Sequence, residues 1–386
     1  MDVLEGHVLN VGFGCTVLAK GLRHGGVDGI GSYTRELGRH FTEDKSVNLV
    51  PVSFVAPSCE ISACLAGAVH VIPHYARRAG VSALSPLSFP EDGLKDLDLF
   101  HATDHLIPKF ANIPVVATLM DAIPLSHPEW VRMRFVHLKN WLWRRASHWA
   151  DHVLTISECS KEDIARHFGI SRNKISVVPL GVDERYFERF SPVQKEEVLR
   201  RLNLPEQFFL FVGTIQPRKN LERLLDAHAS LPLRTQKEVP LVVVGRHGWG
   251  CEALVARMNE ASLSGRVCWM KYLSDRDVRV LMQVARALVF PSLYEGFGLP
   301  VVEAFASGLP VITSNTTSLP EVAGDAALLV NPLDVGEIGE AMHQLVSFPA
   351  IADRLISAGE QRARALSWSA CAQRTLDVYR QVLGAG

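Results

Sequence analysis

The chain has 386 residues, of which 47% are hydrophobic and 21% charged, enough apolar mass for two domains of ordinary size. This composition excludes a disordered or low-complexity chain. The 40 Lys and Arg side chains balance 41 Asp and Glu, so the formal net charge is -1. No overall basic field is therefore available to hold nucleic acid, and we expect no nucleic-acid partner.

Seven cysteines are scattered along the chain without a Cys-x2-Cys pair of the kind that spaces zinc ligands. An odd, scattered set fits a reducing compartment best. The first nine residues carry acids and lack an apolar signal-peptide segment, and no run of about 18 apolar residues predicts a membrane-spanning helix. We therefore expect a cytoplasmic protein that is not embedded in a membrane.

Short apolar runs alternate with longer helical patterns, which predicts parallel sheets covered by helices. Buried strands are expected in the first half at Val8–Val11, Leu49–Val52, Val115–Leu119, Val153–Ile156 and Ile175–Val178. In the second half they are expected at Phe208–Val212, Leu241–Val244, Val267–Met270, Ala287–Phe290 and Val311–Thr313. The two sets predict two Rossmann-like domains, 1–190 and 191–366, and the last stretch, Trp368–Leu383, has the pattern of an amphipathic helix.

Two glycine-bearing loops lie in the first half. Gly12-Phe-Gly14 follows a strand, but Val17 stands where a dinucleotide fingerprint needs its third glycine and no helix is expected directly after it, so NAD is not expected. The stretch Gly25-Gly26-Val-Asp-Gly29-Ile-Gly31-Ser-Tyr-Thr opens an amphipathic helix, with a flexible turn as the alternative. Asp96 and Asp98 have the D-x-D spacing of some metal sites. The two aspartates alternate with apolar residues just before a turn, so we expect no metal site there.

In the second half, three expected strands end in loops that carry glycine, charge or an aromatic ring. These loops hold Gly213 with Arg218-Lys219, then Gly245, then Tyr272. Adjacent cations suit a diphosphate, because arginine forks onto phosphate oxygens and lysine supplies a point charge. A solvated surface pair is the alternative.

The most informative segment is 287–308, which predicts a strand, a loop bearing Gly296 and Gly298, and a short helix with Pro300 at its first position. The N–H groups and positive dipole end of such a helix favour phosphate. Glu295 and Glu303 lie eight positions apart, and carboxylates beside a phosphate site suit sugar hydroxyls. The alternative is a capped helix with two solvated glutamates.

The string Glu295-Gly-Phe-Gly-Leu-Pro-x-x-Glu303-Ala closely resembles the Glu-x7-Glu signature of retaining glycosyltransferase family 4. Family-like motifs continue from Val8 to about Leu383. The resemblance implies the α/β fold class GT-B, with two Rossmann-like domains facing a cleft and the segment 367–386 packing back on the first domain. It makes 1–190 the acceptor side and 191–366 the donor side.

The resemblance also implies roles for individual residues. Glu295 would contact the donor sugar and Glu303 the nucleotide ribose, while Arg218 and Lys219 would meet the diphosphate. Further donor contacts are expected from Gly29, Gly31, Gly213, Gly245, Tyr272, Gly296, Phe297, Gly298 and Leu299. Met120 stands where the family usually has a histidine, so Asp121 is expected in the acceptor pocket, with His101, His105 and His127 as substitutes for the missing histidine.

The expected activity is hexosyl transfer, with mannose favoured, from a nucleotide sugar to an acceptor hydroxyl with retention and without metal or cofactor. GDP-mannose is the favoured donor, followed by UDP-hexoses and dTDP-rhamnose, and the acceptor is expected to be a glycan or a lipid-linked glycan. Two other classes stay open: a sugar-nucleotide epimerase of GT-B shape, and a non-catalytic sugar-nucleotide binding protein. Glu295→Ala or Lys219→Ala is expected to lose most transfer activity while the fold survives.

The segment Trp130–Trp149 contains four tryptophans and five basic residues without an acidic one. Its expected core-facing stripe is Phe135, Leu138, Trp141, Leu142 and Trp149. Trp143 is expected on the opposite, basic face with Arg132, Met133, Val136, Lys139 and Arg144. Such a face predicts peripheral contact with anionic lipids at the inner side of the membrane, and a solvated helix is the alternative.

Overall fold

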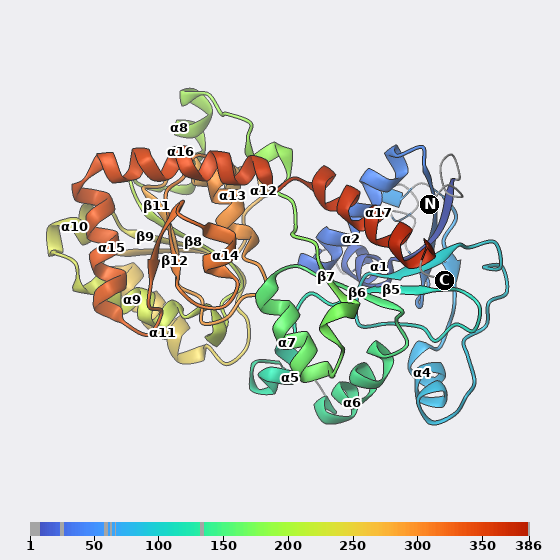
Figure 1. Ribbon diagram of the computed structural model, residues 1–386. Coiled ribbons are helices and arrows are strands. Elements are labelled where there is room, and N and C mark those ends of the chain that lie inside the picture. Colours follow the sequence, from blue (N-terminus) through green and yellow to red (C-terminus); the bar gives the residue numbers. More distant parts are fainter. Residues whose placement is uncertain are drawn as a thin grey trace. The chain divides into compact units, whose positions relative to one another are not determined.

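The computed structural model describes residues 8–23, 27–57, 61, 64–65, 67–131 and 135–384. The chain forms two compact units (Figure 1). The first unit runs to Gly181 and includes the segment from Trp368, and the second unit is Val182–Ser367. This division lies nine residues before the expected boundary between 190 and 191, because 182–190 bonds within the second unit: Val182 N–H donates to Leu366 O at 2.9 Å, and Arg189 Nη1 to Ala306 O at 3.0 Å.

The first unit is built on a seven-stranded parallel sheet with the order β3-β2-β1-β4-β5-β6-β7. Its strands are β1 (Leu9–Gly14), β2 (Val47–Ser53), β3 (His70–Val71), β4 (Leu99–Ala102), β5 (Val115–Thr118), β6 (His152–Thr155) and β7 (Ile175–Val177). Its helices include α1 (Thr16–Arg23), α2 (Gly29–Glu43), α4 (Tyr75–Leu84), α5 (Ile123–Ser126), α6 (Val136–Ser147), α7 (Glu158–Phe168) and α17 (Trp368–Gly384).

The second unit is built on a six-stranded parallel sheet with the order β10-β9-β8-β11-β12-β13. Its strands are β8 (Phe209–Val212), β9 (Leu241–Val244), β10 (Val267–Met270), β11 (Ala287–Phe290), β12 (Val311–Ser314) and β13 (Ala327–Val330). Its α-helices are α8 (Pro192–Leu202), α9 (Leu221–Ser230), α10 (Leu233–Glu238), α11 (Glu252–Leu263), α12 (Asp275–Met282), α13 (Leu299–Ala306), α14 (Leu319–Ala323), α15 (Val335–Ser347) and α16 (Pro349–Ala365). The 3-10 turns η3 (Glu184–Tyr186) and η4 (Pro217–Lys219) lie in this unit as well.

The prediction of two parallel sheets is confirmed, and each expected strand is present. The ends of β9, β10 and β11 are as expected, and those of the other expected strands differ by one to three residues. The sequence pattern missed β3, β4 and β13. All four residues of β4 are buried at the centre of the first sheet. Aspartates precede this strand, so its short apolar run was hidden inside an alternating pattern. Helix α1 begins two residues after Gly14, earlier than expected.

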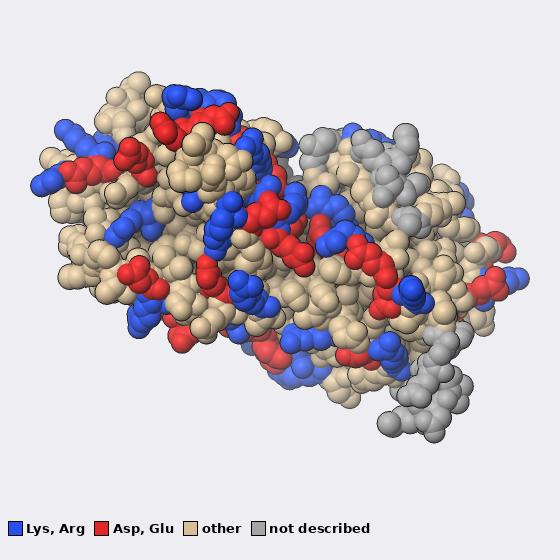
Figure 2. Space-filling model, turned by 90° about the horizontal axis from the view of Figure 1, so that it is seen from above, with Lys and Arg blue, Asp and Glu red and all other residues tan. Residues whose placement is uncertain are grey.

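Helix α17 returns to the first unit and packs against α2. The Tyr379 ring lies 5.8 Å from Phe41, and the Trp368 ring lies 6.2 Å from Tyr33. The Tyr379 hydroxyl lies 2.6 Å from His101 Nδ1 in the core. Acidic and basic side chains are mixed over the face drawn in Figure 2, which matches the near-zero net charge.

Candidate functional site

The candidate site lies at the carboxyl edge of the second sheet. Strands β10, β9, β8 and β11 are parallel neighbours, so their carboxyl ends meet along one edge. Tyr272 follows β10, Gly245 follows β9, Arg218 and Lys219 follow β8, and Glu295 follows β11. Open α/β sheets bind ligands outside the carboxyl ends of their strands. The sequence-predicted residues of this unit therefore gather where such a sheet binds a ligand.

Three of these residues form a compact ion cluster. The Glu295 carboxylate accepts a hydrogen bond from Lys219 Nζ at 2.6 Å and pairs with Arg218 Nη1 at 2.8 Å. Glu295 is 7% exposed and Lys219 9%. Lys219 Nζ also lies 4.6 Å from the centre of the Phe290 ring. Two cations thus share one carboxylate, which leaves a surplus positive charge in a site largely shielded from water.

The pKa values in this cluster follow from that arrangement. Burial alone would raise the pKa of Glu295, but the charges and hydrogen bonds of Lys219 and Arg218 hold it below its usual range. Burial lowers the pKa of Lys219, and the neighbouring Glu295 charge opposes that change. The lowered pKa of Glu295 therefore depends on the cluster staying together, whereas loss of Glu295 would leave burial to lower the pKa of Lys219 without opposition from that charge.

Asn220 joins the β8 loop to its neighbours. Its side-chain Nδ2 donates to Pro291 O at 2.9 Å and to Pro332 O at 2.6 Å, and its backbone is left-handed with φ +57°. The Leu293 N–H also donates to Arg218 O at 2.8 Å. The loops after β8 and β11 are therefore fixed to each other. Sequence reasoning missed Asn220, although asparagine is one of the few residues that readily adopt a left-handed backbone, which is a signal for such a turn.

The loop that carries Glu295 is braced by residues after β12. The Glu295 N–H donates to Thr317 Oγ1 at 3.2 Å, and Ser318 Oγ donates to Glu295 O at 2.8 Å and Phe297 O at 3.1 Å. Thr317 has φ +58°, an uncommon value for a β-branched residue. The residues with hydroxyl groups that end at Ser318 follow β12, a strand that the sequence predicted. The loop to which they bond lies more than 20 residues earlier in the sequence, so the sequence pattern did not indicate these contacts.

Two of the predicted glycines are sterically required. A Cβ atom on Gly245 would overlap the carbonyl oxygen of Gly213, and one on Gly298 would lie 2.7 Å from Leu319 Cδ2. Gly298 also has φ +106° and stands before α13, so no side chain caps this helix. Its first N–H groups are oriented to favour an anion. Gly296 and Phe297 are buried in the preceding loop, and Leu299 begins the helix.

Gly298→Ala is expected to lower the free energy of unfolding by about 1–3 kcal/mol, because both its backbone and the Leu319 contact oppose a Cβ atom. Gly324→Ala is the matched control, since Gly324 also has positive φ but a Cβ atom there would meet no described neighbour within 4 Å. Urea unfolding measures both variants. Equal losses would contradict a specific role for the Leu319 contact.

Glu303 and Tyr272 have different surroundings. Glu303 lies in α13, where burial, followed by the charges of Asp275 and Asp183, raises the pKa of Glu303 to about 7. Tyr272 is 70% exposed, and the Arg246 guanidinium lies 5.0 Å from its ring centre. Glu303 is therefore held within the second unit, whereas Tyr272 presents an aromatic surface to solvent.

The remaining predicted residues belong to the first unit, and their roles are still predictions. Gly29 begins α2, and the Gly31 N–H donates to Asp28 Oδ1 at 2.8 Å. Asp121 Oδ1 accepts a hydrogen bond from the Ile123 N–H at 3.0 Å and shapes the turn into α5. Gly25 and Gly26 lie outside the described residues. Asp98 of the D-x-D pair accepts from the Asn10 N–H at 2.8 Å, at the start of β1.

Of the histidines considered as substitutes, His101 is enclosed in the core. Its Nε2 lies 2.7 Å from Thr118 Oγ1, and burial lowers its pKa to about 3. A neutral, fully buried imidazole cannot meet an acceptor, so that prediction is wrong for His101. His105 stacks on Trp143 with ring centres 4.6 Å apart, and His127 stacks on Trp130 at 3.9 Å.

Helix α6 corrects the expected orientation of the tryptophan-rich segment. Phe135, Leu138 and Trp141 are 65%, 63% and 44% exposed rather than core-facing. Trp143, expected outside, packs against the first core together with Leu142 and Trp149. The helix begins after Phe135, whose φ is +58°, and its inward face includes Trp143 instead of Leu138 and Trp141. Arg132, Met133 and Arg134 lie outside the described residues.

None of the described helices combines the length and apolar character needed to cross a membrane. The feature that bears on peripheral membrane contact is the exposed face of α6, formed by Phe135, Leu138 and Trp141 with exposed Lys139 and Arg145 beside them.

Comparisons with known proteins agree with this arrangement. Residues 27–186 match the family model "Glycosyltransferase Family 4", and residues 194–362 match "Glycosyl transferases group 1". O-antigen chain mannosyltransferase B of Escherichia coli is 36% identical over 229 residues, which are 59% of this chain and 60% of that protein. The MMP alpha-(1->4)-mannosyltransferase of Mycolicibacterium hassiacum is 33% identical over 244 residues, 62% of this chain and 56% of that one.

The fold is similar to that of sucrose-phosphate synthase from Thermosynechococcus elongatus, with a TM-score of 0.74 and 21% identity. That match covers 98% of this chain and 100% of the solved chain. The expected GT-B fold class is confirmed by this likeness and by the two parallel sheets. The sequence matches span less than two thirds of the two mannosyltransferases.

Proposed function

Because the chain belongs to glycosyltransferase family 4, we propose that it transfers a hexose from a nucleotide sugar to an acceptor hydroxyl with retention at the anomeric carbon. The observation that carries this proposal is the buried cluster of Arg218, Lys219 and Glu295 at the carboxyl edge of the second sheet. Two cations supply charge for a diphosphate, and the carboxylate supplies an acceptor for sugar hydroxyls.

In the proposed reaction, the bond between the anomeric carbon and the β-phosphate oxygen breaks, and the acceptor oxygen bonds to the same face of that carbon. The acceptor proton passes to the departing phosphate, so no protein nucleophile is needed. Lys219, Arg218 and the N–H groups at the start of α13 stabilise the charge on the leaving nucleoside diphosphate. Glu295 orients the sugar, and no metal is required in this scheme.

Mannose is the favoured sugar and GDP-mannose the favoured donor, supported by the two mannosyltransferases among the relatives. UDP-hexoses and dTDP-rhamnose are the alternative donors. We propose that the acceptor is a glycan or lipid-linked glycan, supported by the O-antigen enzyme. The first unit would hold the acceptor, with Asp121 in its pocket and Gly29 and Gly31 facing the diphosphate. The second unit would hold the donor, with further contacts from Gly213, Gly245, Tyr272, Gly296, Phe297, Gly298, Leu299 and Glu303.

The direct test is to incubate the protein with GDP-mannose and separately with the other donors, and to follow release of the nucleoside diphosphate. We expect slow hydrolysis without acceptor, faster release when a mannosyl acceptor is added, and an α-linked product by NMR. Isomerised nucleotide sugar without acceptor would instead identify an epimerase. Binding without any release of diphosphate would identify a non-catalytic binding protein.

Peripheral membrane contact at the cytoplasmic face is proposed through α6. Phe135, Leu138 and Trp141 are exposed there beside Lys139 and Arg145, a combination that suits anionic lipid head groups. Neutralising Lys139, Arg144 and Arg145 removes charge attraction worth about 1 kcal/mol each.

The variant Leu138→Ser/Trp141→Ser is expected to lose most sedimentation with phosphatidylglycerol vesicles, because it removes the apolar part of this contact. Val193→Ser/Leu233→Ser is the matched control, since these side chains are 74% and 70% exposed on the second unit. Unchanged sedimentation of the α6 variant, or an equal loss in the control, would contradict the proposed contact.

A further inference from the structure

A chain of buried hydrogen bonds runs through the core of the first unit. The Tyr379 hydroxyl lies 2.6 Å from His101 Nδ1, and His101 Nε2 lies 2.7 Å from Thr118 Oγ1. The chain ends at Tyr33, whose hydroxyl lies 2.9 Å from the same threonine oxygen. All four residues are at most 2% exposed. The chain therefore joins α17, β4, β5 and α2 in a region that is shielded from water.

His101 can bond to both of its neighbours because its ring is neutral. Burial lowers the pKa of His101 to about 3, so one ring nitrogen donates a hydrogen bond and the other accepts one. Burial also raises the pKa of Tyr379 well above its usual range, so this hydroxyl keeps its proton. Removal of either neighbour would leave a buried ring nitrogen without its partner, which is costly. The chain therefore favours one orientation of the His101 ring.

Two members of the chain lie next to residues that the proposed function uses. Thr118 ends β5 and stands three positions before Asp121, whose carboxylate accepts a hydrogen bond from the Ile123 N–H at 3.0 Å. Tyr33 stands two positions after Gly31 in α2. The bond between Thr118 and Tyr33 therefore sets the spacing between the end of β5, which leads into the Asp121 turn, and the start of α2.

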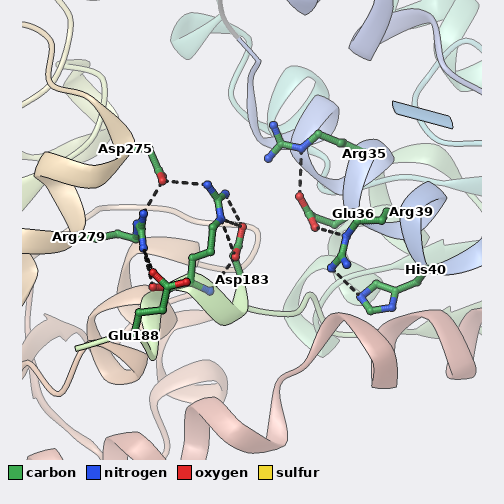
Figure 3. A network of polar contacts seen from close by, with 9 residues as sticks. Arg35, Glu36, Arg39, His40, Asp183, Glu188, Asp275 and Arg279 are labelled. Atoms are coloured by element: carbon green, nitrogen blue, oxygen red, sulfur yellow. Dashed lines mark hydrogen bonds and ion pairs between the residues drawn. The ribbon is translucent and has the colours of Figure 1, made fainter. Parts of the chain in front are cut away.

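The charged side chains of α2 bond to one another, whereas two of its hydroxyl groups bond elsewhere in the first unit. The Glu36 carboxylate accepts hydrogen bonds from Arg35 Nε at 3.0 Å and from Arg39 Nε at 3.3 Å (Figure 3). Thr34 Oγ1 donates to Thr103 Oγ1 at 3.1 Å, just after β4. The hydroxyl chain adds a link to β5, so α2 is hydrogen-bonded at the ends of two neighbouring strands.

We propose that His101 and Tyr379 are positioning residues: through Thr118, they hold the end of β5 so that the turn after it can bind the acceptor. This inference rests on the proposed function, in which Asp121 lies in the acceptor pocket. It gives His101 a part in the reaction without contact with the acceptor, and it links α17 to the acceptor side although Tyr379 lies 278 positions after His101. A purely structural chain would add stability to the first unit without affecting the affinity for an acceptor.

Thr118→Val tests this role, because valine keeps the branched shape of threonine and lacks the hydroxyl at the centre of the chain. Initial rates are measured with the nucleotide sugar that the wild type uses best and with methyl α-mannoside as the acceptor. We expect the KM for the acceptor to rise about tenfold, while donor hydrolysis without acceptor stays within about twofold of the wild-type rate. Thr118→Ser, which keeps the hydroxyl, should restore most of the acceptor affinity.

Tyr379→Phe tests the far end of the chain, and we expect it to raise the KM for the acceptor by about 3–10-fold. Tyr75→Phe is the matched control. It also removes a buried phenol hydroxyl from the first unit, one that donates to Ile107 O at 3.0 Å. This control should lower the melting temperature without changing the KM for the acceptor.

Hydrogen exchange measures the same effect without substrate. We expect the Ile123 amide to exchange about tenfold faster in Thr118→Val and Tyr379→Phe than in the wild type, because the turn that holds it would no longer be fixed. Thr118→Ser and Tyr75→Phe should exchange like the wild type. An unchanged KM in Thr118→Val, or wild-type exchange at Ile123 in both chain variants, would overturn the positioning role. If the wild type transfers no sugar, the proposed function is wrong, and exchange at Ile123 still decides whether the chain holds this turn.

Discussion

Lys219→Ala is expected to reduce the release of GDP from GDP-mannose by about 10²–10³-fold, the usual effect of removing one preorganised group from a developing negative charge. Lys219 Nζ lies 2.6 Å from Glu295 Oε1, and Lys219 is largely buried. Water therefore cannot replace its charge efficiently. Binding of the diphosphate product should weaken as well, because the same ammonium group would contact it before and after cleavage.

The fold should survive this change, since Glu295 keeps its pair with Arg218 at 2.8 Å. Circular dichroism and thermal unfolding would check this, with the exposed Lys237→Ala variant as the control for loss of a lysine elsewhere in the second unit. If turnover of the Lys219→Ala variant stayed within about twofold of the wild-type value, Lys219 would have no part in the proposed mechanism.

Glu295→Gln is expected to lower turnover by about 10²-fold while nucleoside diphosphate binding is retained or tightened. A hydrogen bond from a sugar hydroxyl to a charged group contributes about 1.5–3 kcal/mol, and the neutral amide forfeits most of it. The same substitution frees Arg218 and Lys219 from their shared carboxylate. Both cations are then available to the diphosphate, so binding and turnover should change in opposite directions.

Glutamine is preferred to alanine here for a physical reason. Glu295→Ala would leave Lys219 buried beside Arg218 without any acceptor, and breaking a buried ion pair costs about 3–5 kcal/mol. An inactive alanine variant could then simply be unfolded. The glutamine side chain fills the same space, and its amide oxygen can still accept a hydrogen bond from Lys219. Steady-state kinetics with calorimetry on Glu295→Gln separates the two effects. Parallel losses in turnover and in diphosphate affinity would contradict the assignment of Glu295 to the sugar.

The sequence was informative where the candidate site residues directly follow a recognisable strand pattern. Buried parallel strands appear as continuous apolar runs, so the strands that carry Lys219, Gly245 and Glu295 were predicted near their observed positions. The order of strands along the sheet edge then brought these residues together. Strand β4 was missed because its apolar run is short and follows aspartates.

The supporting contacts were not predictable in the same way. Asn220 and Ser318 act on residues 21 to 112 positions away, as the contacts of Ser318 with Phe297 and of Asn220 with Pro332 show. Such pairings depend on tertiary structure and leave no periodic signal in the chain. The predicted orientation of α6 was wrong for a related reason. The packing of Trp143 against His105, a tertiary contact, is not visible in a helical projection of apolar residues.

The central claim is that the second unit binds a nucleotide sugar at the carboxyl edge of its sheet. Thermal unfolding of the wild type and of Lys219→Ala, with a panel of nucleoside diphosphates and sugar nucleotides, tests it most directly. A ligand at a concentration of about 100 Kd adds about 2.7 kcal/mol to the stability of the folded protein. We expect GDP and GDP-mannose to raise the wild-type Tm by several degrees and to have a much smaller effect on Lys219→Ala. No increase with any nucleotide, or equal increases in both proteins, would contradict the claim.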